Sequence, residues 1–509
     1  MKKKIVTINE LQRIVNQAKK AKKKIVLVHG VFDVIHLGHI EYFREAKNYG
    51  HILIASVTCD QFVNKGFNKP YFKETERCNF LSSIELIDYV VISQSHSSTF
   101  IINYVKPDFY CKGPDYKKKN GDQAGNLLNE KKCVEKNGGK LIITNGVQFS
   151  STSILNSSFE NYNLAKDQIK HIFTGPDEKN IFLDKFDLVL KKIKKEKILV
   201  IGEIIIDNYI DSSPLGSPSK ENIISVHYKE KKSYLGGTVP VVKNISEICD
   251  NITFVSLFNK KETKDRLKKE LSKKVNLKLF YAKDFIEIEK NRFLNIKTKS
   301  KIFEFYKFNN KEYLSNSLLS FLKVNLKKFD KVVICDFGHG LFSKKIISVI
   351  EKSAKFICAN VQTNSGNRGF NLFTKFKKVE FICVDEPEFR IGLSERYKSM
   401  KELLNNNKQL IKYKNLLITL GIDGLLVKFN NNKKSQLLSF PALNKKVLDT
   451  LGAGDAVFSY ASAFINNTKD IRMLAIVGSI AGAIKTNILG HSSFVSINDV
   501  KKSLHTILK

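Results

Sequence analysis

Two histidines, His36 and His39, lie in the stretch 30–39, which reads Gly-Val-Phe-Asp-Val-Ile-His-Leu-Gly-His. The apolar run 25–28 before them predicts a buried strand, and apolar residues between 40 and 46 predict a helix after them. A helix N-terminus attracts anions because its first N–H groups are unpaired and its dipole end is positive. Two imidazoles at that place can donate hydrogen bonds to a polyphosphate, although two surface histidines near a turn are the simpler alternative. The other residues of this turn that we assign to nucleotide binding are Gly30, Phe32, Asp33 and Gly38.

A second stretch with chemical potential, 449–458, reads Asp-Thr-Leu-Gly-Ala-Gly-Asp-Ala-Val-Phe. Its centre, Gly452, Ala453 and Gly454, can present consecutive backbone N–H groups to an anion. The predicted helix that follows directs its dipole at the same place. Asp455 at the start of this helix can take a proton from a hydroxyl group as a phosphoryl group is transferred. A short GxGD alone would also fit an ordinary turn and cap, whereas the whole string favours phosphoryl transfer.

The elements that must position these residues alternate between buried strands and helices. Further strands are expected at 51–57, 89–92, 109–111, 140–143 and 198–202, and helices at 7–20, 77–87, 101–105 and 182–195. This alternation predicts an α/β fold with two doubly wound parallel sheets, whose ligands bind beyond the carboxyl ends of the strands. His36, Lys65 and Lys112 all follow expected strands. We predict a first domain at 1–156, a linker with a helix at 157–196, which could pack on either domain, and a second domain at 197–509.

The first domain resembles the cytidylyltransferase-like nucleotidyltransferases, and most of all the transferase domain of bifunctional heptose-phosphate kinase/adenylyltransferases. The resemblance covers about residues 24–156 and is carried by 30–39, Arg77, the Lys-Gly-Pro-Asp-Tyr run 112–116 and the Ser-Ser-Thr-Ser-Ile run 150–154. It implies that a sugar phosphate attacks the α-phosphorus of an NTP and releases pyrophosphate. It further implies that His36 and His39 bind the triphosphate and that Lys112 faces the reacting phosphates. The remaining contacts that it implies are Lys65, Arg77, Ser151, Thr152 and Ser153 for phosphate and Asp115 for the sugar, with surface charge as the alternative for each basic residue.

The second domain resembles the ribokinase-like (PfkB) sugar kinases over about residues 197–505. The string 449–458 resembles the family signature, and 336–340 and 419–424 resemble two further family turns. The resemblance implies that Asp455 is the catalytic base and that Gly452–Gly454 form the anion hole. It also implies sugar contacts at Asp207, Gly236 and Gly237, nucleotide contacts at Thr419, Gly421 and Gly424, and a magnesium site at Asp385 and Glu388.

The kinase-like part departs from the family pattern on the sugar side. Glu203 replaces the usual aspartate, Pro240 replaces an asparagine, and Asp385 replaces the first residue of an NxxE element. Two readings follow, an active kinase with an altered substrate or a vestigial kinase domain beside an active transferase. We favour activity because Asp455 and the three anion-hole residues are all present.

The composition suits a folded enzyme of small anionic substrates. The 509 residues are 42% hydrophobic and 27% charged, with a formal net charge of +35. The lysines are spread along the chain, which favours a solvated surface that gathers anions over the clustered basic patch of a nucleic-acid binder. A basic nucleotide- or RNA-binding protein nevertheless remains an alternative, and a homo-oligomer remains open.

The expected location is the cytoplasm. The eight cysteines occur singly, without metal-ligand spacing, which suits buried apolar positions in a reducing compartment. Neither a signal-peptide pattern nor an apolar run long enough for a membrane span is evident. The sequence therefore predicts a bifunctional enzyme for a heptose-like sugar, using Mg²⁺ and ATP or another NTP.

Overall fold

The computed structural model describes residues 4–63, 70–95, 97–113, 127–145, 169, 171–216, 223–298, 300–308, 311–313, 315–406, 410, 412–431, 434–444, 447–488, 490 and 493–508. The chain forms two compact units, Met1–Asn163 and Leu164–Lys509. Each unit is described by itself below. Both are α/β units built on a mainly parallel sheet, as predicted.

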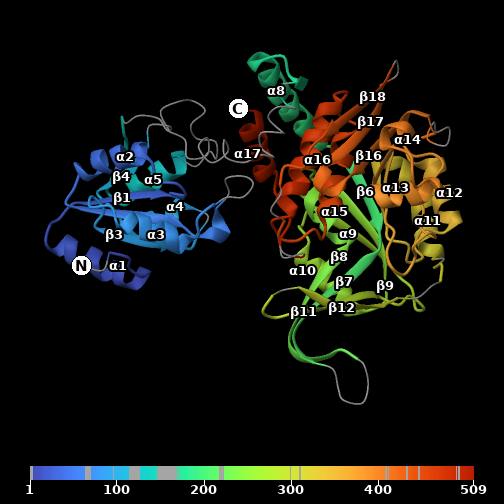
Figure 1. Cartoon of the computed structure of the whole chain (residues 1–509), viewed down its shortest axis with the longest axis horizontal. Helices are drawn as coiled ribbons and strands as arrows, with labels where there is room; N and C mark the ends of the chain where they lie inside the picture. Colours follow the sequence, from blue (N-terminus) through green and yellow to red (C-terminus); the bar gives the residue numbers. More distant parts are fainter. Residues whose placement is uncertain are drawn as a thin grey trace. The chain divides into compact units, whose positions relative to one another are not determined.

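The first unit is a five-stranded parallel sheet in the order β3-β2-β1-β4-β5 (Figure 1). Its strands are β1 (Ile25–Gly30), β2 (Ile52–Thr58), β3 (Tyr89–Ser93), β4 (Phe109–Lys112) and β5 (Lys140–Ile143). Its helices are α1 (Ile8–Lys20), α2 (Leu37–Lys47), α3 (Glu74–Ser82), α4 (Ser98–Val105) and α5 (Leu127–Lys136), and a short 3₁₀ helix, η1, spans Asp60–Phe62. Successive residues of β1 point to opposite faces, so Val26 and Val28 join a core with α2 and α3, whereas Ile25 and Leu27 join a core with α1, α4 and α5.

Helices α3, α4 and α8 (Pro176–Ile193) begin earlier than the sequence predicted. Helix α3 starts at Glu74, where the Glu76 carboxylate accepts a hydrogen bond of 2.8 Å from the backbone N–H of Lys73. Helix α8 starts before the helix expected at 182–195. Proline suits the first turn of a helix because its missing N–H would find no partner there.

The second unit contains a nine-stranded sheet in the order β10-β9-β6-β13-β14-β15-β16-β17-β18. The strands from β10 to β16 run parallel, and β17 and β18 continue the sheet antiparallel to their neighbours. Their bounds are β6 (Lys197–Gly202), β9 (Asn251–Phe258), β10 (Val275–Tyr281), β13 (Lys331–Asp336), β14 (Ile357–Val361), β15 (Phe381–Asp385), β16 (Asn415–Thr419), β17 (Leu425–Asn431) and β18 (Lys434–Phe440).

Helices pack against this sheet and against one another. α15 (Ala453–Phe464) contacts α9 (Thr238–Ser246), α16 (Ile471–Lys485) and α8, and α16 also contacts α17 (Ile497–Leu508). Elsewhere α11 (Asn316–Asn325) packs on α12 (Lys344–Ser353). The remaining helices are α10 (Lys261–Glu270), α13 (Glu386–Leu393) and α14 (Met400–Asn406), with 3₁₀ turns η3 (Leu326–Lys328), η4 (Phe373–Lys375) and η6 (Gly421–Asp423).

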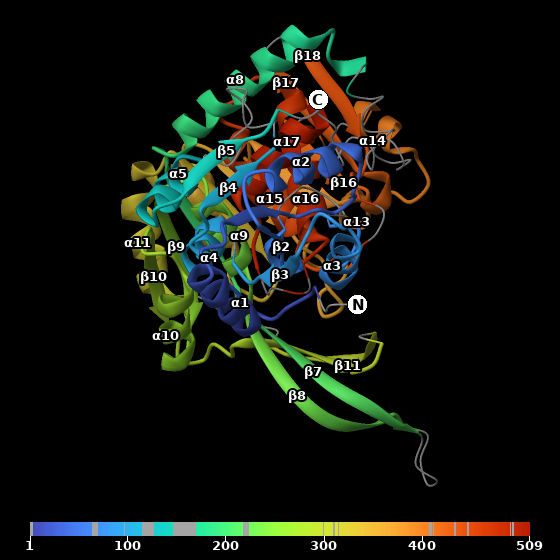
Figure 2. The ribbon, with the colours of Figure 1, turned by 90° about the vertical axis from the view of Figure 1, so that its left-hand side faces the viewer.

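A separate four-stranded sheet has the order β12-β11-β7-β8. It consists of β7 (Ile204–Gly216), β8 (Ser225–Gly237), β11 (Ile288–Asn295) and β12 (Lys301–Lys307). β7 and β8 form a long antiparallel pair that extends away from the body of the second unit (Figure 2). β11 joins β7 in parallel, which places Lys290 beside Asp207 and Arg292 beside Tyr209.

Helix α8 packs on the second unit. Phe186 stacks on Phe464 of α15 at 5.4 Å between ring centroids. The Arg472 guanidinium lies 4.7 Å from the Phe173 ring centroid, donates to the Ile172 carbonyl at 2.8 Å and forms an ion pair with Glu178 at 2.6 Å. The helix before β6 is therefore a structural part of the kinase-like unit.

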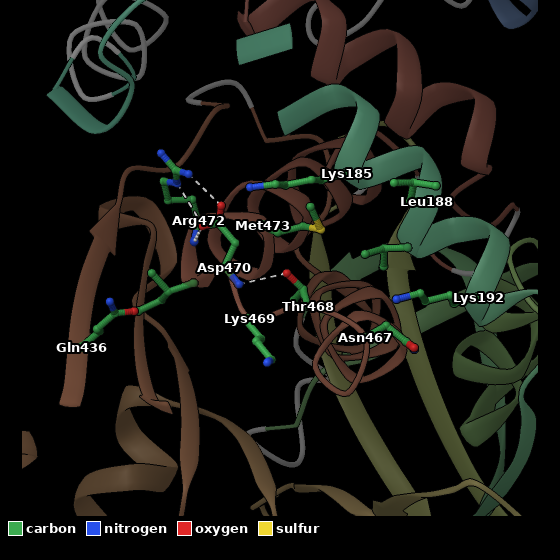
Figure 3. A pocket seen from close by; sticks show the side chains of 12 residues that line it. Lys185, Leu188, Lys192, Gln436, Asn467, Thr468, Lys469, Asp470, Arg472 and Met473 are labelled. Atoms are coloured by element: carbon green, nitrogen blue, oxygen red, sulfur yellow. Dashed lines mark hydrogen bonds and ion pairs between the residues drawn. The ribbon is translucent and has the colours of Figure 1, made fainter. Parts of the chain in front are cut away.

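A cavity of about 570 Å³ opens between α8 and the start of α16 (Figure 3). Its lining includes Lys185 and Leu188 of α8, Gln436 of β18 and Thr468 before α16. None of the residues predicted for catalysis or binding lines it.

All eight cysteines are free thiols, and seven of them are buried, as their apolar sequence contexts predicted. Among the helices that the structure describes, none has the length and apolar character needed to cross a membrane.

Candidate active sites

The histidine pair lies where β1 ends and α2 begins. His36 is the N-cap residue of α2, and its carbonyl accepts the backbone N–H of His39 at 2.8 Å. The two imidazole rings lie 4.0 Å apart between centroids. Phe32 takes a left-handed backbone conformation with φ of 51°, which brings its ring against His39 and over Gly30. A Cβ at Gly30 would lie 3.2 Å from that ring, so the absence of a side chain at Gly30 leaves room for the Phe32 ring. Gly38 lies in the first turn of α2.

Asp33 and Arg77 brace the loops around this turn. The Asp33 carboxylate accepts the backbone N–H groups of Tyr71 and Phe72 at 2.8 and 2.9 Å. Arg77 has an exposed fraction of 0%, and its guanidinium donates to the carbonyl oxygens of Val31, Thr58 and Phe72 and to the Asp60 carboxylate. These bonds use four of the five guanidinium N–H groups, so a phosphate contact at Arg77, which stays a prediction, would have to use the fifth N–H or replace one of these bonds.

Lys112 ends β4, the strand next to β1, and forms a buried ion pair. Its ammonium lies 2.9 Å from the Glu130 carboxylate of α5, and each side chain is only 7% exposed. Glu130 also accepts hydrogen bonds from the Ser98 hydroxyl and, at 3.4 Å, from the Tyr110 hydroxyl. The chain moves from β3 to β4 across the sheet, so β1 and β4 flank its topological switch point, where α/β sheets bind ligands. His36 follows β1, and Lys112 is the last residue of β4.

His29 at the end of β1 was not predicted as a site residue. Its ring nitrogens lie 3.1 Å from the Ser56 hydroxyl and 3.4 Å from the Thr58 hydroxyl. Burial, helped by the charge of Lys112, lowers the pKa of His29 to about 3, so the imidazole is neutral. The polar residue at the end of an apolar strand was the signal that could have found it.

Five predicted transferase residues lie outside the described residues. They are Lys65, Asp115, Ser151, Thr152 and Ser153.

In the second unit, Asp455 lies next to the carboxyl end of β14. Gln362, the first residue after β14, donates its side-chain N–H to the Asp455 carboxylate at 2.7 Å. Asp455 is buried in the first turn of α15, and Gly452 caps that helix with φ of 74°. A Cβ at Gly454 would meet no atom within 4 Å, so the backbone here faces open space. Gly452, Ala453 and Gly454 thus present a helix N-terminus with room for an anion beside a carboxylate.

Asp385 and Glu388 cap helix α13 reciprocally. The Glu388 N–H donates to Asp385 at 2.7 Å, the Asp385 N–H donates to Glu388 at 3.0 Å, and the Thr363 N–H donates to Glu388 at 2.8 Å. Burial and the neighbouring Asp385 raise the pKa of Glu388 to about 8, and burial also raises the pKa of Asp385. Carboxylates suit Mg²⁺ and retain free lone pairs beside these bonds, so the pair fits the predicted metal by donor type. Within the described ranges, no group of three or more His, Cys, Asp or Glu side chains is arranged to hold a metal ion.

Glu203, a departure from the family pattern, organises the turn after β13. Its carboxylate accepts the backbone N–H groups of Phe337, His339 and Leu341 at 2.8, 3.1 and 3.4 Å. Burial and the nearby Asp336 raise its pKa to about 7. Gly237 is the N-cap of α9 and has φ of 62°. A Cβ at Gly237 would lie only 2.5 Å from the Glu203 carbonyl oxygen. Gly236 pairs with Ile205.

The predicted sugar contact Asp207 lies on β7 beside two cations of β11. Arg292 donates to the Asp207 carboxylate at 2.5 Å, and both side chains are buried. Lys290 is close enough to Asp207 and Asp455 for both carboxylates to raise its pKa, although burial lowers it overall. The carboxylates of Asp207 and Asp455 and the cations of Lys290 and Arg292 therefore lie close enough together to interact electrostatically. No local sequence pattern marked Lys290 or Arg292.

The predicted nucleotide contacts follow β16. Thr419 ends this strand, and Gly421 and Gly424 have φ of 62° and 94°. A Cβ at Gly421 would meet nothing within 4 Å, whereas one at Gly424 would lie 2.1 Å from the Phe440 carbonyl oxygen. Gly421 thus leaves space for a ligand, and Gly424 allows a close approach of two backbones.

Known families match both halves of the chain. A cytidylyltransferase-like family matches residues 27–157, and the pfkB family carbohydrate kinase description matches residues 195–495. Bifunctional protein HldE of Aliarcobacter butzleri is 35% identical over 139 residues, which are 27% of this chain and 29% of that protein. HldE of a Nitratiruptor species is 39% identical over 117 residues, which are 23% of this chain and 25% of that protein. These matches thus span less than a third of the length of either relative.

Among solved structures, phosphofructokinase-2 of Escherichia coli resembles the chain with a TM-score of 0.51 and 14% sequence identity. The match covers 62% of this chain and 100% of that one. At this identity the likeness shows a shared fold, and the predicted sites rest on the geometry above.

Proposed function

Because the chain belongs to the pfkB family of carbohydrate kinases and carries a cytidylyltransferase-like region before it, we propose that it makes a sugar nucleotide with two active sites. One site phosphorylates a heptose-like sugar or sugar phosphate with ATP. The other transfers a nucleotidyl group from an NTP to a sugar phosphate. The observation that carries this proposal is that, among the described residues, each unit has motif residues at the carboxyl ends of adjacent parallel strands.

In the kinase step, the acceptor hydroxyl oxygen forms a bond to the γ-phosphorus of ATP as the bond to the β-phosphate oxygen breaks. Asp455 takes the hydroxyl proton, and Gln362 holds its carboxylate in place at 2.7 Å. The N–H groups of Gly452–Gly454 and the dipole of α15 stabilise the charge on the transferred group. The products are ADP and the phosphorylated sugar.

In the transferase step, a phosphate oxygen of the sugar phosphate attacks the α-phosphorus, and pyrophosphate leaves. His36 and His39 at the start of α2 hold the departing phosphates, and their hydrogen bonds offset the charge that develops there. Lys112 lies at the end of the neighbouring strand, and in this proposal its ammonium contacts the reacting phosphates. We assign this activity to 1–156 and the kinase activity to 197–509, with α8 as part of the kinase body.

Magnesium is the proposed cofactor, and it would neutralise phosphate charge at each site. In the kinase, Asp385 and Glu388 would hold it through the lone pairs that the α13 capping bonds leave free. Their role at neutral pH depends on Glu388, whose raised pKa the charge of a bound cation would lower again.

A mass-spectrometric screen tests the proposal. The purified chain is incubated with Mg²⁺, each of the four NTPs and a panel of sugars and sugar phosphates. We expect one sugar phosphate to give an NDP-sugar with pyrophosphate and one sugar to gain a phosphate from ATP. NDP-sugar formation without phosphorylation of any sugar would refute the active kinase and support a vestigial one. Absence of both products, together with tight RNA binding that weakens steeply with salt, would favour the RNA-binding alternative.

A further inference from the structure

Lys485, the last residue of α16, is a buried lysine that the proposed mechanism does not use. Its side chain is 2% exposed. Its ammonium donates to the carbonyl oxygen of Gly490 at 2.5 Å and to that of Ile488 at 3.3 Å. No ion pair of Lys485 within 4.0 Å is seen among the described residues. Two backbone carbonyls therefore bind a positive charge inside the kinase unit.

The segment that Lys485 holds is bonded in turn to the segment that enters the anion hole. The Gly490 N–H donates to the Asp449 carboxylate at 2.8 Å, and the same carboxylate accepts the Leu451 N–H at 3.0 Å. The N–H groups of Leu448 and Asp449 donate to the Thr486 carbonyl at 2.9 and 3.1 Å. Since Gly452 follows this segment directly, the position of the anion hole depends on the residues that Lys485 holds.

The charge of Lys485 also acts on the site. Burial lowers the pKa of Lys485 overall, while Asp449 and the proposed catalytic base Asp455 are both near enough to raise it in part. The ammonium is thus bonded to two carbonyl oxygens and also interacts electrostatically with two carboxylates. An ammonium ion and a potassium ion are similar in size, and both bind carbonyl and carboxylate oxygens.

We propose that Lys485 is a positioning residue of the kinase and serves as a built-in monovalent cation. It fixes the 448–451 segment through Gly490 and adds positive charge behind the anion hole. The kinase consequently needs no added monovalent cation. This inference rests on the proposed kinase activity.

The simpler alternative is a lysine that only caps the C-terminus of α16, since lysines commonly bond the last carbonyls of a helix. Such a cap would affect stability alone. A built-in cation leaves, when removed, a space lined by oxygen atoms that a small cation can fill. The two roles therefore differ in their response to salt.

The test uses Lys485→Met in the full chain, assayed for turnover in choline chloride, potassium chloride and ammonium chloride at equal ionic strength. We expect wild-type turnover to be the same in all three salts. The variant should lose about 100-fold in kcat in choline, the order of effect seen when one preorganised electrostatic group is removed. Potassium or ammonium should restore at least a tenth of the wild-type rate.

Lys331→Met is the matched control. Lys331 is another fully buried lysine of the same unit, which donates to the Ala463 carbonyl at 2.7 Å and pairs with Glu196 at 3.3 Å, at the start of β13. Its loss should lower stability, but a cation that fills this space should not change kcat, because Ala463 lies near the C-terminal end of α15 and the anion hole lies at its start. Equal recovery of both variants in potassium would overturn the proposal.

A second readout does not depend on turnover. Potassium should raise the thermal midpoint of Lys485→Met above its value in choline, and it should leave the wild type unchanged. Full wild-type turnover of Lys485→Met in choline, or a folded but inactive variant that responds to no cation, would overturn the proposal. If the methionine variant does not fold, Lys485→Gln, which keeps one donor, is judged by the same outcomes. A wild-type chain without kinase turnover would refute the proposed function instead, and the thermal shift would still decide the role of Lys485.

Discussion

The buried pair of Lys112 and Glu130 yields a prediction that separates structure from catalysis. In Lys112→Met, the Glu130 carboxylate stays buried and loses the ammonium at 2.9 Å. Removing one partner of a buried ion pair costs about 3–5 kcal/mol, because an uncompensated charge remains. Glu130 keeps its bonds from Ser98 and Tyr110, so we expect the lower end of that range, about 3 kcal/mol.

The double variant Lys112→Met/Glu130→Gln removes that charge. A glutamine can still accept from the Ser98 and Tyr110 hydroxyls, so the loss should shrink to about 1 kcal/mol, the worth of one hydrogen bond. Hydrogen exchange in the full chain, followed at the amides of β4 and its neighbour β1, measures the opening free energy of the first unit. The matched single variant Glu130→Gln completes the double-mutant cycle.

The reasoning would be refuted if Lys112→Met cost less than about 1 kcal/mol, or if the double variant were no more stable than the single one. Pyrophosphate release by the double variant then addresses chemistry. Restored stability without pyrophosphate release would assign Lys112 to the reacting phosphates. Restored stability together with full release would make the lysine purely structural.

Three further predictions concern the two sites. His39→Ala should lower pyrophosphate release by about 100-fold or more and leave sugar phosphorylation intact. Asp455→Asn should lower sugar phosphorylation to a similar extent and leave pyrophosphate release intact. Both activities are assayed in the full chain of each variant, and a loss of both in either variant would contradict separate sites. Gly424→Ala should destabilise the second unit by about 2 kcal/mol or more in urea unfolding, because a Cβ there would lie 2.1 Å from a carbonyl oxygen and the backbone φ is 94°. Gly421→Ala is the matched control: it also has a positive φ but open space around it, so it should cost only about 1 kcal/mol. Burial raises the pKa of Glu388 to about 8, so the unfolded chain ionises first and wild-type stability should fall as pH rises from about 4.5 to about 8. Glu388→Gln should show a smaller fall in urea unfolding at pH 5, 6.5 and 8, because Glu203, with a pKa raised to about 7, still contributes in the variant. Parallel curves would refute the shift at Glu388.

The five strands of the first sheet and β6 were predicted, because buried parallel strands read as short apolar runs. Strand β1 ends at Gly30, where the stretch 30–39 begins, and Asp455 lies in the first turn of α15, as its motif predicted. Gln362 could also have been predicted as a site residue, since it is a polar residue that directly follows the strand 357–361. Helix starts were less certain, because the cap at Lys73 and the first-turn proline Pro176 begin helices within turn-like sequence.

The pairing of distant charges could not be predicted. Arg292 meets Asp207 only because β11 adds to β7 in a particular register, and nothing near either residue encodes that register. Likewise, an arginine that binds phosphate and one that binds three carbonyls have the same local sequence, so the surroundings of Arg77 required the fold.

Helix α8 has a consequence for how such chains arise. Its Phe186 covers Phe464, and Arg472 of α16 holds the residues just before it. A recombination event that joined a new upstream domain directly to β6 would remove this cover and leave apolar surface open to aggregation. Gene fusion and domain exchange should therefore be tolerated upstream of residue 171 and selected against between there and β6, so the ancestry of the two halves should change before α8 rather than at the first strand of the kinase sheet.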